Sequence, residues 1–89
     1  MHVQVKLFAT FRQYLPPNSK AGACDLEVPA GTQVLKVLSN LGVPLEKPDS
    51  VVILVNGRQA DLKHTLDEGD VVSAFPAIAG GEYNLRSPD

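Results

Sequence analysis

The sequence predicts one α+β domain in which a main helix packs across one face of a mixed sheet of about five strands. Two observations predict it: apolar residues alternate near the start, and a single helical apolar period lies between short strand-like runs. The chain has 89 residues, the length of one domain. Its hydrophobic content of 44% and charged content of 20% are ordinary for a globular protein.

The first two strands are predicted over residues 1–8 and 23–28. Alternation over the first run sorts its side chains onto two faces of a half-buried strand. One set is Val3, Val5 and Leu7, and the other is His2, Gln4, Lys6 and Phe8. Between the strands, residues 9–15 suit a short helical turn, and Pro16-Pro17-Asn18-Ser19 has the composition of a loop.

The main helix is predicted after the turn at residues 29–31. Its apolar residues recur with the helical period, at Val34, Val37, Leu38 and Leu41. Thr32 is a plausible N-cap, because its hydroxyl can accept a hydrogen bond from a free N–H of the first turn. Gly42 suits the left-handed position after the helix, and Pro44 stops it from continuing.

A hairpin is predicted directly after the helix. Residues 51–55 are all apolar, which predicts a central strand buried on both faces. Asn56-Gly57 is the strongest short hairpin signal in the chain, and it implies a brief returning strand around residues 58–60.

The last strand is predicted over residues 71–75 and is halted by Pro76. A short turn or helical segment over residues 63–68 and a tight turn at Gly69-Asp70 precede it. The long crossovers allow this strand to pair parallel to the first in the middle of the sheet. The order β-β-α-β-β-β is that of a ubiquitin-like β-grasp. We expect this domain to cover residues 1–79, with residues 80–89 as a flexible Gly-Gly arm and C-terminal extension.

Nearly the whole chain resembles the MoaD/ThiS family of ubiquitin-like sulfur carriers, and most of all its molybdopterin synthase small-subunit branch. No single motif is specific, but their ordered set is. The matching residues are Val5-Lys6-Leu7-Phe8-Ala9 with Arg12, then Val55-Asn56-Gly57, then Thr65-Leu66-x-x-Gly69-Asp70-x-Val72-x-x-Phe75-Pro76-x-x-x-Gly80-Gly81.

The resemblance implies a carrier and not an enzyme, with no bound cofactor. An ATP-using, MoeB/ThiF-like adenylating enzyme would activate the Gly81 carboxylate, and sulfur transfer would make a thiocarboxylate. The acceptor would be a MoaE-like large subunit of molybdopterin synthase. Thiamin, cysteine and tRNA thiolation routes, or conjugation to proteins, are variants of the same chemistry. A non-covalent β-grasp interaction module is the alternative. Gly80 and Gly81 suit a narrow channel because glycine lacks a Cβ.

A binding surface is expected around Phe8 and Phe75, which would both point outward from adjacent strands. Exposed apolar patches commonly mark interaction sites. In the family this sheet surface docks both partners, so we assign Phe8, Phe75, Pro76 and Ile78 to partner binding. Pro76 would end strand pairing and free the arm. Alternatively, one or both phenylalanines pack under the loop at residues 16–22. Gln59 is polar where relatives often carry an apolar residue.

The chain departs from the family by continuing past Gly81 as Glu82–Asp89. A free Gly81 carboxylate therefore requires cleavage between Gly81 and Glu82, for which a JAMM-type zinc metalloprotease is the expected enzyme. Two alternatives to such cleavage stay open: the carrier role has been lost, or the tail itself binds a partner through Tyr83 and Leu85.

Several other sites are excluded or left open. The net charge of −2 argues against nucleic acid binding. Cys24 is expected to be a small buried strand residue, and the two histidines have no metal-ligand spacing. The absence of a membrane span or signal peptide makes the cytoplasm the default compartment. Arg12 would pair with an acid or touch a partner. The acids Asp67, Glu68 and Asp70 form either a solvated turn or an electrostatic docking site.

Overall fold

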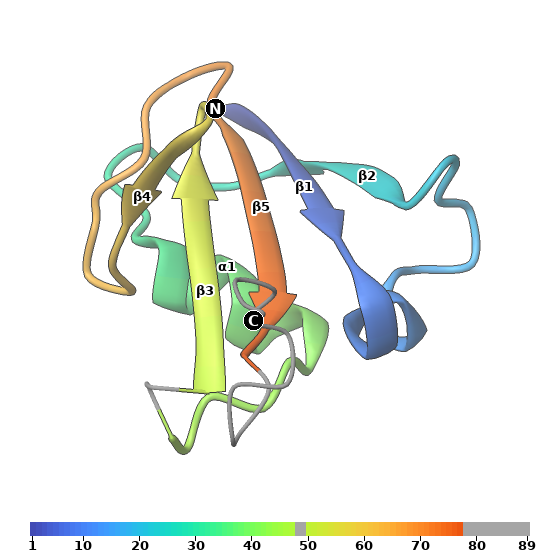
Figure 1. The fold of residues 1–89 in the computed structure, drawn as a ribbon. Coiled ribbons are helices and arrows are strands. Elements are labelled where there is room, and N and C mark those ends of the chain that lie inside the picture. Colours follow the sequence, from blue (N-terminus) through green and yellow to red (C-terminus); the bar gives the residue numbers. More distant parts are fainter. Residues whose placement is uncertain (48–49, 78–89) are drawn as a thin grey trace.

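A five-stranded sheet lies in front of a single α-helix in the computed structural model, which describes residues 1–47 and 50–77 (Figure 1). The elements in chain order are β1 (His2–Leu7), the 3₁₀ helix η1 (Ala9–Tyr14), β2 (Ala23–Glu27), α1 (Val34–Leu41), β3 (Val51–Val55), β4 (Arg58–Ala60) and β5 (Val71–Pro76). This arrangement confirms the predicted β-grasp.

The sheet order is β2-β1-β5-β3-β4, so the first and last strands are neighbours in its middle. They run parallel, with Val5 beside Val72 and Leu7 beside Ala74. All other pairs are antiparallel. The predicted parallel pairing is therefore confirmed. The hairpin between β3 and β4 turns at Asn56 (φ 53°) and Gly57 (φ 84°), as the Asn-Gly signal requires.

The core lies between the sheet and α1. Each strand contributes the residues of one face, and α1 contributes Val34, Val37 and Leu38, all completely buried. The larger side chains sealed inside are Val3, Val5, Leu7, Leu66 and Val72. None of the buried residues in the part that the structure describes is polar or charged. Burial of this apolar surface, at about 25 cal/mol per Å², is the main favourable term for the fold.

The start of α1 differs from the prediction. Gln33, and not Thr32, holds the N-cap position, and no side chain caps it. The Thr32 hydroxyl instead donates to the carbonyl of Pro29 at 2.7 Å. The first helical N–H groups donate to backbone carbonyls from the segment between β4 and β5: Val34 to His64 at 3.0 Å and Leu35 to Leu62 at 2.8 Å. At the other end, Gly42 adopts φ 91° as predicted.

Two predictions about the strands are also wrong. β3 is not buried on both faces, because Ile53 and Val55 face the core while Val52 and Leu54 are only partly covered. Pro76 does not end strand pairing: it lies opposite Val51, and the next residue, Ala77, still donates its N–H to the Ser50 carbonyl at 2.8 Å. A proline fits here because, with that bond and the β3–β5 register, its missing N–H points away from β3.

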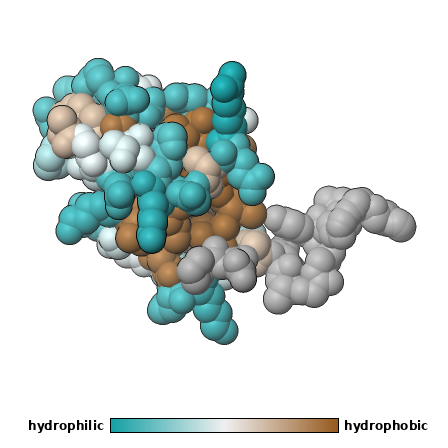
Figure 2. All heavy atoms as spheres, turned by 90° about the vertical axis from the view of Figure 1, so that its left-hand side faces the viewer, coloured by the Kyte–Doolittle hydropathy of each residue, from teal (hydrophilic) through white to brown (hydrophobic). Residues whose placement is uncertain are grey.

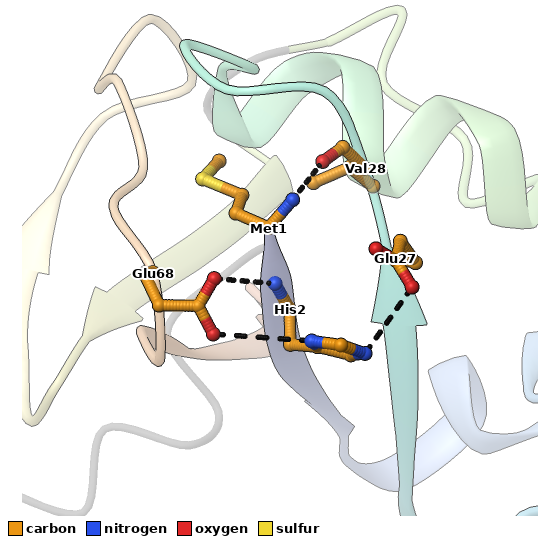
Figure 3. A network of polar contacts seen from close by, with 5 residues as sticks. All are labelled: Met1, His2, Glu27, Val28 and Glu68. Carbon is orange, nitrogen blue, oxygen red and sulfur yellow. Dashed lines mark hydrogen bonds and ion pairs between the residues drawn. The ribbon is translucent and has the colours of Figure 1, made fainter.

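Met1 and the first residue of β1, His2, are tied to the neighbouring segments by polar contacts (Figure 3). The Met1 amine donates to the Val28 carbonyl at 2.7 Å, and the His2 N–H donates to Glu68 Oε1 at 3.0 Å. The His2 ring lies between two carboxylates, 3.2 Å from Glu27 and 3.9 Å from Glu68. The contacts of His2 are exposed, so each of its ion pairs adds little to stability, whereas the bond between Met1 and Val28 is partly buried.

Candidate functional site

The candidate functional site is the open face of the sheet, defined as the face turned away from α1. Figure 1 shows this face toward the viewer, with the helix behind it. Because side chains alternate along a strand, the register gives its central members: Lys6 of β1 with Phe8 directly after that strand, Ser73 and Phe75 from β5, and Val52 and Leu54 from β3. Lys6 and Ser73 are polar, and the other four members are apolar.

Phe8 and Phe75 are the two aromatic residues among these apolar members. Their rings stack with centroids 4.2 Å apart and planes inclined by 9°. The stack follows from the parallel register, since Leu7 pairs with Ala74 and each phenylalanine is the next residue. Phe8 stays 36% exposed. Both rings therefore lie on the open face, as expected. Their contact with each other supports the assignment of Phe8 and Phe75 to the same face of the sheet.

Val52 and Leu54 extend this apolar area, and the sequence interpretation missed them. A continuous apolar run does not distinguish a strand buried on both faces from one with a partly exposed face. Val52 lies directly beside Phe75, and Leu54 lies between Ser73 and Gln59 on its two sides. Gln59 thus marks the polar border toward β4. We call Phe8, Phe75, Val52 and Leu54 the apolar patch.

The remaining arm predictions fall on residues outside those that the structure describes. These are Ile78, Gly80, Gly81 and Glu82, together with the boundary at residues 79–80. The last described residue, Ala77, is held beside Ser50 at the end of the sheet that carries Phe8 and Phe75. The chain therefore leaves the described structure next to the apolar patch.

The acidic turn before β5 has a structural role that the sequence did not reveal. The Asp70 carboxylate accepts from the Asn56 amide at 2.9 Å and from the Asp67 N–H at 2.8 Å. The Asn56 side chain in turn accepts from the Val71 N–H at 2.9 Å. These bonds join the β3–β4 turn to the start of β5. Asp70 belongs to this link, and Glu68 is bonded to His2, so neither carboxylate is simply solvated.

Arg12 and Cys24 are two further residues that the sequence analysis considered, and both lie within the described structure. The Arg12 guanidinium lies against Gly22, where an added Cβ would come within 3.1 Å of it, and Arg12 has no ion pair in the part of the chain that the structure describes. Cys24 is a buried, unpaired strand residue as expected. Desolvation by burial raises the pKa of its thiol, and the nearby Asp25 charge raises it further.

No metal or membrane site emerges from residues 1–47 and 50–77. They contain no group of three or more His, Cys, Asp or Glu side chains placed to hold a metal ion. Within the same ranges, no helix has the length and apolarity needed to cross a membrane.

Comparison with known proteins agrees with this picture. Residues 1–80 match the family model described as Mut7-C ubiquitin. The small archaeal modifier protein 3 of Haloferax volcanii is 32% identical, over 91% of this chain and all of that protein.

Two solved structures share the fold. The putative molybdopterin converting factor, subunit 1, from Pyrococcus furiosus is 30% identical and has a TM-score of 0.64, covering 86% of this chain and 98% of that one. A chain from the protein–protein complex of subunits 1 and 2 of the molybdopterin-converting factor from Helicobacter pylori 26695 has a TM-score of 0.56 at 22% identity, covering 91% of this chain and 100% of that one. Such relatives are small carrier or modifier proteins and not enzymes. The chain belongs to the Mut7-C ubiquitin family of MoaD/ThiS-like, ubiquitin-like proteins.

Proposed function

We propose that this chain is a sulfur carrier whose Gly81 carboxylate, exposed after removal of residues 82–89, is adenylated and then converted to a thiocarboxylate. The sulfur is donated in molybdopterin biosynthesis in the cytoplasm. The observation that carries the proposal is the placement of β5: it runs beside the aromatic stack and leads, through Ala77, toward Gly80-Gly81. The apolar patch and the last described residue before Gly80-Gly81 thus lie at the same end of the sheet.

The proposed chemistry needs an activated carboxyl group, because a free carboxylate has no adequate leaving group. A MoeB/ThiF-like enzyme joins the Gly81 carboxylate to AMP from ATP and releases pyrophosphate. A sulfur nucleophile then displaces AMP and leaves a thiocarboxylate. The apolar patch docks on the adenylating enzyme and then on a MoaE-like subunit, while the arm enters each active site. A JAMM-type protease cuts between Gly81 and Glu82.

A second candidate is conjugation of Gly81 to lysine side chains of other proteins. It is favoured by the similarity to small archaeal modifier protein 3, which extends over all of that protein. Conjugation starts from the same acyl adenylate, so the two candidates share the arm and the docking surface. They differ only in the nucleophile that attacks Gly81.

The test of the proposal is the intact mass of the protein isolated from its native cells. We expect a chain that ends at Gly81, in part heavier by the difference between sulfur and oxygen. Bands of higher mass, in which Gly81 is joined to lysines, would instead support conjugation. A chain that keeps residues 82–89 while the pathway operates would contradict both candidates.

Replacing Phe8 with alanine should weaken docking more than it weakens the fold. Exposed aromatics in a protein interface are common hot spots, so we expect a loss of about 2 kcal/mol, roughly 30-fold in Kd, toward the adenylating enzyme. Calorimetric titration measures the affinity. Leu35→Ala is the matched control, because Leu35 is similarly exposed, at 38%, but lies on α1. Equal losses of affinity for both variants would show that the open face is not part of the interface.

A further inference from the structure

Strand β2 forms one edge of the sheet and, among the strands that the structure describes, pairs only with β1 (Figure 1). The backbone bonds between Met1 and Val28, at 2.7 and 2.8 Å, identify these two residues as a hydrogen-bonded antiparallel pair. Such pairs alternate with non-bonded ones along a ladder. In the observed register, the Leu26 and Cys24 backbones therefore face β1, and those of Glu27 and Asp25 face outward.

The outward backbone groups of Asp25 and Glu27 form an unoccupied ladder edge. Neither residue has a backbone hydrogen bond to another part of the chain among residues 1–47 and 50–77. The edge ends at Ala23, whose N–H and carbonyl are both bonded to Lys20 at 3.0 Å. Two N–H and two C=O groups, spaced as in a strand, are thus available to an added strand.

A cleft of about 470 Å³ lies along the same strand. One wall is the loop that carries Pro16, Asn18 and Lys20. The other is formed by β2, with Ala23, Cys24, Asp25 and Leu26, and by Gln4 of β1. A new strand would lie about 4.8 Å from β2, the usual spacing between paired strands. The cleft and the free ladder edge are independent observations, and both fit an extended peptide segment.

Charge identifies the kind of segment. The side chains of Asp25 and Glu27 are exposed and project on the open-face side of β2, opposite Gln4 and His2. Cross-strand pairs of opposite charge are favourable, whereas like charges facing each other are unfavourable. A second copy pairing antiparallel through β2 would place acids opposite acids around Asp25. A segment with lysine or arginine at alternate positions is therefore the fitting occupant.

We propose that the free edge of β2 binds an extended segment of a partner protein, with basic residues at alternate positions, as a sixth strand. This binding uses neither Gly81 nor the apolar patch, so it goes beyond the proposed carrier function. The acidic side chains select the segment by charge, and the backbone groups of Asp25 and Glu27 hold it by hydrogen bonds.

The probe for this proposal is an acetylated and amidated hexapeptide of alternating lysine and valine, added to the full chain. We expect amide hydrogen exchange at Asp25 and Glu27, followed by NMR, to slow roughly tenfold or more when the peptide is saturating. Two matched peptides serve as controls. One has the same sequence with N-methyl groups on the bonding amides, and the other alternates glutamate and valine. Neither should protect these amides.

A variant of the chain with reversed charge on β2 provides a second test, in which the same two peptides are expected to exchange roles. In the double variant Asp25→Lys, Glu27→Lys, protection should move from the lysine–valine peptide to the glutamate–valine peptide. Equal binding of the N-methylated peptide would show electrostatic attraction without strand addition and overturn the proposal. Protection at other residues, no binding by any peptide, or protection without peptide in a sedimenting dimer would overturn it too. If no peptide binds, the role left for Asp25 and Glu27 is to prevent aggregation through the exposed edge strand.

Discussion

Replacing Gly81 with valine is expected to abolish activation of the chain by its adenylating enzyme. In a narrow channel, the added side chain displaces the carboxylate from its attacking position, and a misplacement of about 1 Å costs on the order of 100-fold in rate. Glycine is required because it has no Cβ and adopts backbone conformations that other residues avoid. The measurement is ATP–pyrophosphate exchange, with the chain made to end at residue 81.

The control for Gly81→Val is Thr10→Val, which places the same side chain at an exposed position of η1. It should leave the exchange rate unchanged. Thermal unfolding of both variants should match that of the parent, because residue 81 comes after the described strands in the sequence and Thr10 is exposed. Sulfur transfer at the parental rate by Gly81→Val would disprove the carrier function, since no other carboxyl group is proposed to be activated.

Replacing Leu66 with alanine should cause the largest loss of stability among the changes considered. Leu66 is 1% exposed, and its N–H donates to the Thr32 carbonyl at 2.9 Å, next to the start of α1. A fully buried leucine truncated to alanine loses about 2–5 kcal/mol. Domains have total stabilities of about 5–15 kcal/mol, so this change removes a large fraction. Urea denaturation followed by circular dichroism measures the loss.

Leu35→Ala is the matched control for this experiment as well. Leu35 keeps 38% of its surface exposed, so its truncation should cost less than about 1 kcal/mol. Figure 2 shows the hydrophobic surface on the β4 side of the molecule, where partly covered apolar residues still reach solvent. Similar midpoints for Leu66→Ala and Leu35→Ala would mean that the segment between β4 and β5 contributes little to the folding core.

Local sequence patterns determined most of the elements. Alternation around Val3, Val5 and Leu7 identified the first strand, and the period from Val34 to Leu41 identified the helix. Asn56-Gly57 specified its hairpin because both residues accept positive φ, which the two-residue turn requires. In each case the information lies in a few neighbouring residues. The resemblance of the ordered motifs then pointed to the right family.

The tertiary structure alone decided which polar groups and which strand faces find partners. The residues next to Thr32 in the sequence give no reason to reject it as the N-cap. The acceptors that take the place of its hydroxyl are the backbone carbonyls of Leu62 and His64, which are distant in the sequence. The Asp70 carboxylate is used by Asn56, a residue far along the chain. The partly open face of β3 and the free edge of β2 also follow from sheet order. Hydrogen bonding and burial depend on which segments meet in space, and that is set by long-range pairing.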